Sequence, residues 1–327
     1  LMTKNVTIFG GSGFVGRYIV RSLVPQGCAV KIAVRNPESA AFLVKETSDR
    51  QVQAVKGDIL DEASVTNALD GADCVVNCVG TFDIRGTNNF VAIQQEGATR
   101  IAKLAAEAGI ARMVHLSSIG ASEDSSSVYS QTKARGEAGV LTNIAEPFIL
   151  RPSVIFGPED QFFNRFAELS KVAPVLPVVG ASTRFQPVYV GDVAQAVVQA
   201  VTGEKTPGIY ELGGPDVKTF RELMTLMLTQ IERKRPLFDI PLPLARLMAF
   251  GMDNVQRITG GLIPAQITPD QVRSLQSDNV VSEDALSFSD LGIAPTPLGD
   301  VLPDYLWKYR PGGHPPAPAA ASEGKPS

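Results

Sequence analysis

Short apolar runs alternate with amphipathic stretches through the first two thirds of the chain. The runs are almost continuously apolar, a pattern typical of parallel strands that helices cover on both faces. The clearest helical stretch is residues 89–109, where Ile93, Ile101 and Leu104 recur at helical spacing and Gly109 ends the pattern. This alternation predicts an α/β fold with a doubly wound parallel sheet. The predicted strands of the first half are residues 6–9, 29–35, 52–58, 74–80 and 112–118.

The pattern continues toward the C-terminus with more interruptions. Residues 147–157 and 211–215 read as further strands, and a short strand begins at 187–190. Asp192 is expected to cap the helix that follows it, and another helix is predicted over about 220–231.

These elements suggest a sheet domain followed by a smaller part. We expect the sheet domain at residues 1–215, with 150–190 contributing to its cleft. A smaller, mostly helical part follows at 216–310. Residues 311–327 are mainly Pro, Ala, Gly and Ser, so this tail is expected to be disordered.

One predicted helix has no obvious place in the sheet domain. Residues 244–258 carry an apolar stripe that must be buried against something. The stripe covers a substrate cleft of the same chain, or it docks on a hydrophobic partner or a membrane surface. The sequence leaves these alternatives open. The apolar residues of the stripe include Leu247, Met248, Phe250, Met252, Val255 and Ile258.

Composition and charge narrow the class of protein. A net charge of -4 in 327 residues does not favour nucleic-acid binding. Two histidines and three cysteines, with Cys74 and Cys78 inside one apolar run, make a metal site improbable and suggest a reducing compartment. No signal-peptide pattern and no apolar run of transmembrane length occur, so we expect a cytoplasmic protein that is soluble or peripheral.

The strongest motif is a glycine-rich turn between the first strand and the first helix. It reads Gly10-Gly11-Ser12-Gly13-Phe14-Val15-Gly16. Gly10 permits the tight turn, Gly13 lets a pyrophosphate approach the backbone, and Gly16 lets the helix pack closely. The helix N-terminus then attracts the phosphates. The motif predicts a Rossmann-type dinucleotide site that includes Ser12, Phe14 and Val15.

The end of the second strand bears on which dinucleotide is bound. NAD-binding folds usually place an acidic residue there, but this chain has Val34-Arg35-Asn36-Pro37. The Arg35 guanidinium suits a 2′-phosphate, and Arg17 adds positive charge beside the glycine motif. NADP(H) is therefore favoured over NAD(H). The alternative is that Arg35 is only a solvated loop residue.

The third strand ends in Gly57-Asp58-Ile59-Leu60-Asp61. An aspartate at this place accepts a hydrogen bond from an adenine amino group or caps the next helix. A further alternative is that Asp58 and Asp61 each take one of the two roles.

Together, the glycine motif, this segment, the VVNCVG strand and Tyr129-Ser130-Gln131-Thr132-Lys133 resemble an extended or atypical short-chain dehydrogenase/reductase. The resemblance covers about residues 4–215. It implies an adenine contact for Asp58 with Ile59 beside it, and a cofactor-lining strand end at Val79 and Gly80. Pro152 is placed with the cofactor-binding residues as well.

The same resemblance implies a catalytic pair. Residues four apart share a helical face, so Lys133 is expected to hold the nicotinamide ribose and to lower the pKa of the Tyr129 phenol. Ser118, or Ser117 as the alternative, is expected to orient a substrate carbonyl.

Two departures weaken this catalytic interpretation. Gln94 takes the place where the family often has asparagine, which suggests that a proton relay is missing. Only ten residues separate Ser118 from Tyr129, whereas sugar-nucleotide enzymes of the superfamily tend to have a longer stretch. A sugar-nucleotide substrate is therefore not expected.

A narrower resemblance extends to about residue 312. LRPSVIFGPED at 150–160, TPDQVR at 268–273, DNVV at 278–281 and PDYL at 303–306 are similar to the NADPH-binding accessory subunit of respiratory complex I, alpha-subcomplex subunit nine, and its bacterial relatives. This resemblance implies a structural NADPH, partners among complex I subunits near the membrane arm, and a peripheral location on the bacterial inner membrane or the equivalent matrix side. The alternative is a free NADP-dependent oxidoreductase or epimerase that acts on a small carbonyl or isoprenoid-like substrate. The retained Tyr129 and Lys133 favour that alternative.

Overall fold

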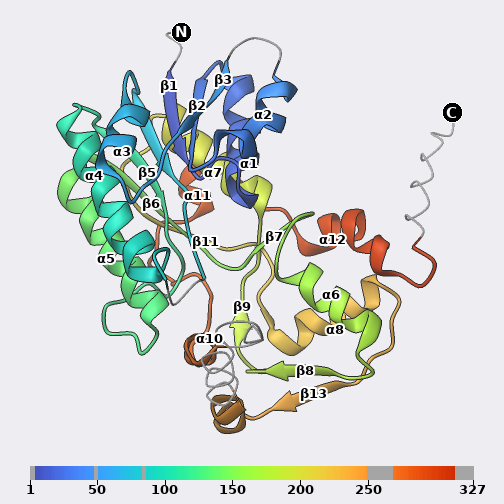
Figure 1. Cartoon of the computed structure of the whole chain (residues 1–327). Helices are drawn as coiled ribbons and strands as arrows, with labels where there is room; N and C mark the ends of the chain where they lie inside the picture. Colours follow the sequence, from blue (N-terminus) through green and yellow to red (C-terminus); the bar gives the residue numbers. More distant parts are fainter. Residues whose placement is uncertain (1–3, 48–50, 83–85, 249–267, 314–327) are drawn as a thin grey trace, which may run out of the picture.

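The computed structural model describes residues 4–47, 51–82, 86–248 and 268–313. Its centre is a seven-stranded parallel sheet with the strand order β11-β6-β5-β4-β1-β2-β3 (Figure 1). The predicted Rossmann-type doubly wound sheet is therefore confirmed. The strands are β1 (Asn5–Phe9), β2 (Ala29–Val34), β3 (Val52–Lys56), β4 (Cys74–Asn77), β5 (Arg112–Leu116), β6 (Glu146–Pro152) and β11 (Gly208–Leu212).

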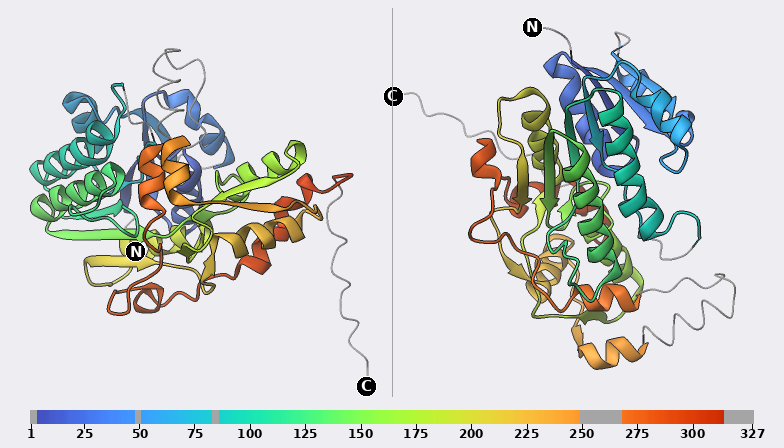
Figure 2. Two further views of the ribbon diagram at one scale, coloured as in Figure 1. Left: turned by 90° about the horizontal axis from the view of Figure 1, so that it is seen from below. Right: turned by 90° about the vertical axis from the view of Figure 1, so that its left-hand side faces the viewer.

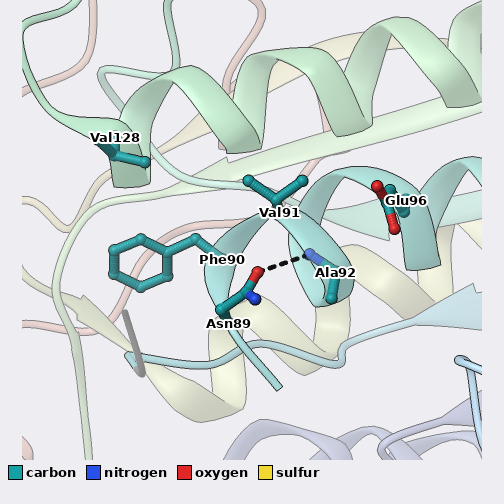
Figure 3. A pocket seen from close by; sticks show the side chains of 6 residues that line it. All are labelled: Asn89, Phe90, Val91, Ala92, Glu96 and Val128. Carbon is teal, nitrogen blue, oxygen red and sulfur yellow. Dashed lines mark hydrogen bonds between the residues drawn. The ribbon is translucent and has the colours of Figure 1, made fainter. Parts of the chain in front are cut away.

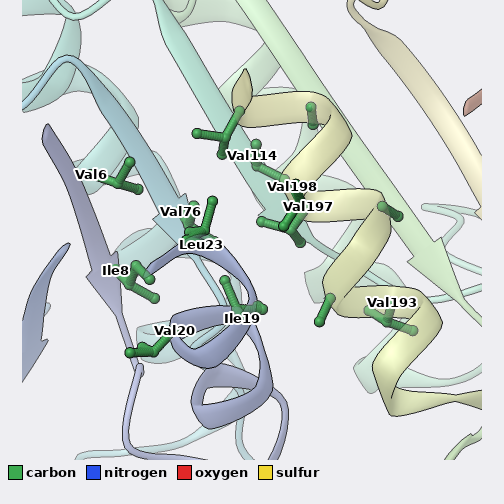
Figure 4. Packing of buried hydrophobic residues seen from close by; sticks show 14 of the residues in the cluster. Val6, Ile8, Ile19, Val20, Leu23, Val76, Val114, Val193, Val197 and Val198 are labelled. Carbon is green, nitrogen blue, oxygen red and sulfur yellow. The ribbon is translucent and has the colours of Figure 1, made fainter. Parts of the chain in front are cut away.

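Helices cover both faces of this sheet because its strands are apolar on both sides. On one face, α1 (Phe14–Leu23) and α7 (Val190–Thr202) pack on Val6, Ile8 and their neighbours (Figure 4). Helix α2 (Ala41–Glu46) adds Leu43 to the same core. On the other face lie α3 (Glu62–Leu69), α4 (Ala98–Glu107) and α5 (Val128–Asn143). Helices α4 and α5 run side by side (Figure 2). Short 3-10 turns η1 (Val24–Gln26) and η2 (Pro37–Ala40) flank β2.

The helix predicted at residues 89–109 has two parts. It opens with a π-helix, η3 (Val91–Gly97), and continues as α4. Gly109 ends it with a φ of +78°, as the sequence indicated. Helix α7 begins at Val190, and Asp192 does not cap it as predicted. The Asp192 carboxylate instead accepts hydrogen bonds from the amide and hydroxyl of Thr296.

A second lobe sits beyond the carboxyl ends of the strands (Figure 1). Its core joins residues on both sides of β11 in the sequence, among them Phe163, Phe220 and Leu302. The lobe is mostly helical, as predicted, with short strand pairs at its edges. Its elements are β7 (Ile155–Phe156), α6 (Phe163–Val172), β8 (Leu176–Val179), β9 (Arg184–Phe185), β10 (Val188–Tyr189), β12 (Lys218–Thr219), α8 (Phe220–Gln230), β13 (Leu237–Ile240), α10 (Pro269–Ser274), α12 (Leu298–Leu306) and η4 (Trp307–Tyr309).

The C-terminal part also returns to the sheet. Helix α11 (Phe288–Leu291) buries Phe288 and Leu291 in the core beneath α7. Residues beyond 215 therefore contribute to both cores, and the domain bounds drawn from the sequence stay a prediction. Of the predicted helix 244–258, residues 244–248 are described as helical, and the rest lies outside the described residues, as does most of the predicted tail.

Candidate functional site

The glycine loop between β1 and α1 has the backbone that the motif requires. Gly10 has a φ of +80°, a backbone conformation that residues other than glycine rarely adopt. A Cβ on Gly16 would overlap the carbonyl oxygen of Gly10, so α1 packs tightly on the turn. Gly13 occupies the N-cap position of α1. The loop thus leaves the amides at the start of α1 pointing out of the sheet edge, where an anion is stabilised by the helix.

The Arg17 side chain folds back from α1 onto the glycine loop. Its guanidinium donates to the carbonyls of Gly13 and Ser12, at 3.2 and 3.4 Å, and pairs with Glu159 at 3.6 Å. Glu159 also accepts from the Tyr18 hydroxyl at 2.8 Å. The sequence analysis missed Glu159, since no motif indicates that a residue of the second lobe reaches the phosphate loop.

Arg35 is exposed directly after β2. Within the described residues, no carboxylate pairs with its guanidinium. The next residue, Asn36, caps the 3-10 turn η2 by accepting from the Glu38 amide. The Ser39 hydroxyl at the end of this turn lies 3.3 Å from the Ser12 hydroxyl. Ser39 is a second residue that sequence reasoning missed, and it extends the polar rim of the glycine loop toward Arg35.

Of the two roles considered for the aspartates after β3, the structure assigns the helix cap to Asp61. Asp61 is the N-cap of α3 and accepts from the Ala63 amide at 3.1 Å. Asp58 is half-buried, and its Oδ1 accepts from the Leu60 amide at 3.0 Å. Ile59 is buried against Gly97 of the π-helix. Because Asp61 supplies the cap, the Asp58 carboxylate is left with acceptor capacity at the sheet edge.

The ends of β4 and β6 lie at the same edge, as parallel strands require. Val79 abuts the glycine loop, since a Cβ on Gly10 would lie 3.1 Å from its methyl group. The Val79 amide donates a hydrogen bond to the Asn77 Oδ1 at 3.1 Å. This contact holds the backbone directly before Gly80. Pro152 is buried at the end of β6, and its carbonyl accepts from the Ile119 amide. These residues line one continuous edge with the glycine loop.

Tyr129 and Lys133 lie on the first two turns of α5. The Lys133 Nζ is 5.9 Å from the centre of the Tyr129 ring and donates to the Leu116 carbonyl at 3.2 Å. Burial lowers the pKa of Lys133 to about 8. Burial also raises the pKa of Tyr129, so the expected lowering of this pKa by Lys133 is not found. The structure thus brings together the pair that the spacing indicated, with a lysine whose proton is less tightly held than in water.

Two phenylalanines that the sequence did not indicate enclose Tyr129. The Phe82 ring stacks on the phenol with centroids 5.8 Å apart, and the Phe90 ring meets it edge-on at 5.6 Å. Phe82 is 72% exposed, so it forms an outer apolar wall.

Two serines after β5 were candidates for orienting a carbonyl. Both hydroxyls are buried, and neither makes a hydrogen bond of ordinary geometry in the described part of the chain. Ser118 lies near the Tyr129 phenol and partly opposes the rise in its pKa. This proximity favours Ser118 over Ser117.

Gln94 occupies the π-helix beside α5. Its Nε2 donates to the Thr81 carbonyl at 2.8 Å, and its Oε1 accepts from the Thr132 hydroxyl at 3.1 Å. A Cβ on Gly136 would overlap the Gln94 carbonyl oxygen, so the two helices cross in close contact. The amide therefore braces the helix that carries Lys133.

Other titratable groups behind the site are held neutral. Burial lowers the pKa of His115 to about 3 and raises the pKa of Cys74 and Cys78 to about 12. The His115 Nδ1 lies 3.2 Å from the Asn77 amide nitrogen. The two cysteines are free thiols at opposite ends of β4, with Cys74 its first residue and Cys78 directly after its last, and both pack among apolar residues as their sequence context indicated. In the described ranges, no cluster of His, Cys, Asp or Glu is arranged to hold a metal ion.

An open hollow of about 340 Å³ lies next to Phe90 (Figure 3). Asn89 at its rim accepts a hydrogen bond from the Ala92 amide at 3.0 Å. The hollow adjoins the aromatic wall of Tyr129 but is separate from the glycine loop. Its lining residues are Asn89, Phe90, Val91, Ala92, Glu96 and Val128.

Comparison with known proteins shows the family of the chain. Residues 6–213 match the model of the NAD dependent epimerase/dehydratase family. The chain belongs to this family. The match runs from β1 to the end of β11 and includes the glycine loop and α5.

Relatives named as respiratory subunits align along nearly the whole chain. The mitochondrial NADH dehydrogenase (ubiquinone) 1 alpha subcomplex subunit 9 of Arabidopsis thaliana is 36% identical over 314 residues, which cover 94% of this chain and 78% of the relative. The NADH-ubiquinone oxidoreductase 40 kDa subunit of Neurospora crassa is 31% identical over 306 residues, 93% of this chain and 79% of the relative. A ceramide reductase of Caulobacter vibrioides is 31% identical over 242 residues, 73% of this chain and 74% of the relative.

Solved structures share the fold at low identity. The NADPH-dependent quinone oxidoreductase QOR2 of Escherichia coli, complexed with NADPH, superposes with a TM-score of 0.69 at 17% identity and covers 90% of this chain and 97% of its own. The Bordetella bronchiseptica enzyme WbmG, in complex with NAD, gives 0.62 at 15% identity, with 84% and 93% covered. Within the described residues, no helix of this chain is long and apolar enough to span a bilayer.

Proposed function

We propose that the chain is an NADPH-binding accessory or assembly subunit of NADH:quinone oxidoreductase, respiratory complex I. The observation that carries this proposal is the extent of its likeness to complex I subunits, which covers 94% of the chain and so includes the second lobe. The Rossmann sheet alone supports many functions. Because the second lobe is also shared with named respiratory subunits, the function of an accessory subunit is favoured among these. In this proposal the protein is located peripherally on the inner membrane, on its cytoplasmic side in bacteria or on the equivalent matrix side.

In this proposal the cofactor is NADP(H), and its role is mainly structural. The exposed Arg35 has no carboxylate partner in the described residues, and Ser12 and Ser39 add hydroxyls between it and the glycine loop. Asp58 would receive the adenine, and Val79 and Gly80 would line the nicotinamide half. A ligand that binds only the folded chain stabilises it by mass action.

Replacing Arg35 by alanine is expected to remove the preference for NADPH over NADH. A charge-assisted contact to the 2′-phosphate is worth about 2 kcal/mol, or about 30-fold in affinity. Calorimetric titration of both cofactors on the two proteins measures the change. Lys45→Ala, which removes an exposed positive charge from nearby α2, is the matched control and should leave the preference intact. Equal affinities of the unaltered protein for the two cofactors contradict the assignment.

The second lobe exposes an apolar surface that suits a partner subunit. Of the helix at residues 242–248, Leu244, Leu247 and Met248 are 46%, 69% and 44% exposed, while Ala245 is buried. Phe238 on the adjacent β13 is 59% exposed. A lid packed on its own cleft would bury these side chains. Their exposure favours docking on a hydrophobic subunit of the membrane-bound dehydrogenase.

A charge placed on this surface is expected to abolish docking. Leu247→Glu should reduce recovery of respiratory subunits from membranes at least about tenfold, as loss of an interface anchor does. Leu141→Glu on the exposed face of α5 is the matched control and should not change recovery. The full chain is used because residues 268–309 contribute to both cores. If the unaltered chain recovers no respiratory subunits, the accessory-subunit proposal fails.

A free NADP-dependent oxidoreductase or epimerase is the second candidate. The proximity of Ser118, Tyr129 and Lys133 favours it, because this set suffices to orient a carbonyl and transfer a proton. The likeness to a ceramide reductase supports the same idea. Turnover of NADPH by the purified chain with a ketone substrate separates the two candidates.

A further inference from the structure

Helix α5 receives its N-terminal cap from a distant part of the chain. The Asp270 carboxylate of α10 accepts from the Ser127 hydroxyl at 2.8 Å, the Val128 amide at 2.7 Å and the Tyr129 amide at 3.2 Å. Helix α10 lies at the end of α5 in the side view of Figure 2. A contact between residues 141 to 143 positions apart therefore holds the turn that carries the Tyr129 phenol.

This arrangement is not the ordinary cap of either helix. Thr268 already caps α10 with a complete capping box. The Ser127 hydroxyl is a weak cap of α5, at 3.4 Å from the Ser130 amide, and it also donates to Asp270. Asp270 is 6% exposed, and the Arg273 guanidinium lies 3.7 Å from its Oδ1. The charge of this buried carboxylate is compensated by the two amides at the N-terminus of α5 and by the Ser127 hydroxyl.

A second anchor of the same segment reaches the loop that carries Ser118. The Asn279 amide nitrogen donates to the Ile119 carbonyl at 3.3 Å, and its Oδ1 accepts from the Ser153 hydroxyl at 2.6 Å. Ile119 directly follows Ser118. Residues 270 to 279 thus contact both loops on which the carbonyl-binding side of the site depends.

We propose that Asp270 is a positioning residue for Tyr129, and that through it the second lobe sets the geometry of the nicotinamide half of the site. The proposal rests on the proposed NADP(H) binding. It assigns a role to a segment outside the residues that the family model matches. Asp270 acts on helix α5 and does not touch the cofactor. Its loss should therefore weaken binding of the nicotinamide half of the dinucleotide and not of the adenine half.

The test uses the full chain and two matched substitutions. Asp270→Asn keeps the size of the side chain but removes the charge and one acceptor. Asp192→Asn is the control, since Asp192 likewise accepts an amide and a hydroxyl, from Thr296, at the first turn of a helix without site residues. Hydrogen exchange of the Val128 and Tyr129 amides in the cofactor-free protein should accelerate at least about tenfold in Asp270→Asn and stay unchanged in Asp192→Asn.

Binding of two ligands separates positioning from simple loss of stability. Asp270→Asn should weaken NADPH about fivefold or more while changing 2′-phospho-ADP-ribose, which lacks the nicotinamide, less than about twofold. Asp192→Asn should change neither. Equal loss of both ligands, or unchanged amide exchange, overturns the inference.

Failure of the proposed function gives a different result from failure of this inference. If the unaltered chain binds neither ligand, NADP(H) binding is wrong, and amide exchange alone then decides the role of Asp270. If Asp270→Asn does not fold, Ser127→Ala takes its place. It removes the hydroxyl contact to Asp270, together with the weak cap of Ser130 and the contact with Ser274, and keeps both amide contacts of Asp270. It should produce the same selective loss of NADPH to a smaller degree, while equal loss of both ligands would again overturn the inference.

Discussion

Replacing Arg151 by alanine is expected to destabilise the fold by about 3–5 kcal/mol, because it leaves a buried carboxylate unpaired. Arg151 of β6 donates to both oxygens of Glu137 on α5, at 2.9 and 2.6 Å, and Glu137 is only 3% exposed. Glu211 of β11 lies 3.6 Å from the same guanidinium. The pair joins β6, the neighbour of the edge strand β11, to the helix that carries Tyr129.

The matched control has the same chemistry on the surface. Arg21 donates to both oxygens of Glu46 at 2.9 Å, with side chains 42% and 46% exposed. Arg21→Ala should cost less than about 1 kcal/mol, since water solvates the remaining carboxylate. Urea unfolding followed by circular dichroism measures both values. Similar losses in the two variants would show that burial does not govern the strength of the Arg151 pair.

Replacing Tyr129 by phenylalanine is expected to separate binding from chemistry. The change removes only the hydroxyl, and the ring keeps its contacts with Phe82 and Phe90. NADPH affinity and recovery of respiratory subunits should therefore stay within about twofold. Any NADPH-dependent reduction of a ketone by the chain should fall about 100- to 10,000-fold, the usual contribution of a positioned proton donor.

Cofactor titration, membrane recovery and turnover on one preparation decide this result. Tyr210→Phe is the control, since that buried hydroxyl donates to the Thr206 carbonyl far from the glycine loop. A Tyr129→Phe protein that assembles normally but has lost a measurable reductase activity identifies the chain as an enzyme as well as a subunit. A variant that no longer assembles contradicts the view that the hydroxyl serves chemistry alone.

The fold was predictable where local pattern and physical cause coincide. Continuous apolar runs predicted the parallel strands because both faces of each strand are covered. The positive φ of Gly10 and the close packing of Gly16 follow from residue types that only such a turn requires. The cap assigned to Asp192 was wrong, because its carboxylate accepts from the amide and the hydroxyl of Thr296 instead. Thr296, a partner distant in the sequence, took the place of the adjacent helix N-terminus that the sequence suggested.

By itself the sequence determined the sheet, the glycine loop and the shared helical face of Tyr129 and Lys133, since each depends on backbone conformation or on spacings of a few residues. The tertiary structure alone decided what surrounds them. Glu159 reaches Arg17 from the second lobe, Phe82 stacks on Tyr129, and Asp270 caps α5 across about 140 residues. Such contacts arise from packing whole elements together, and no periodicity encodes them. The site therefore combines a locally encoded loop and helix with an enclosure that only the complete fold assembles.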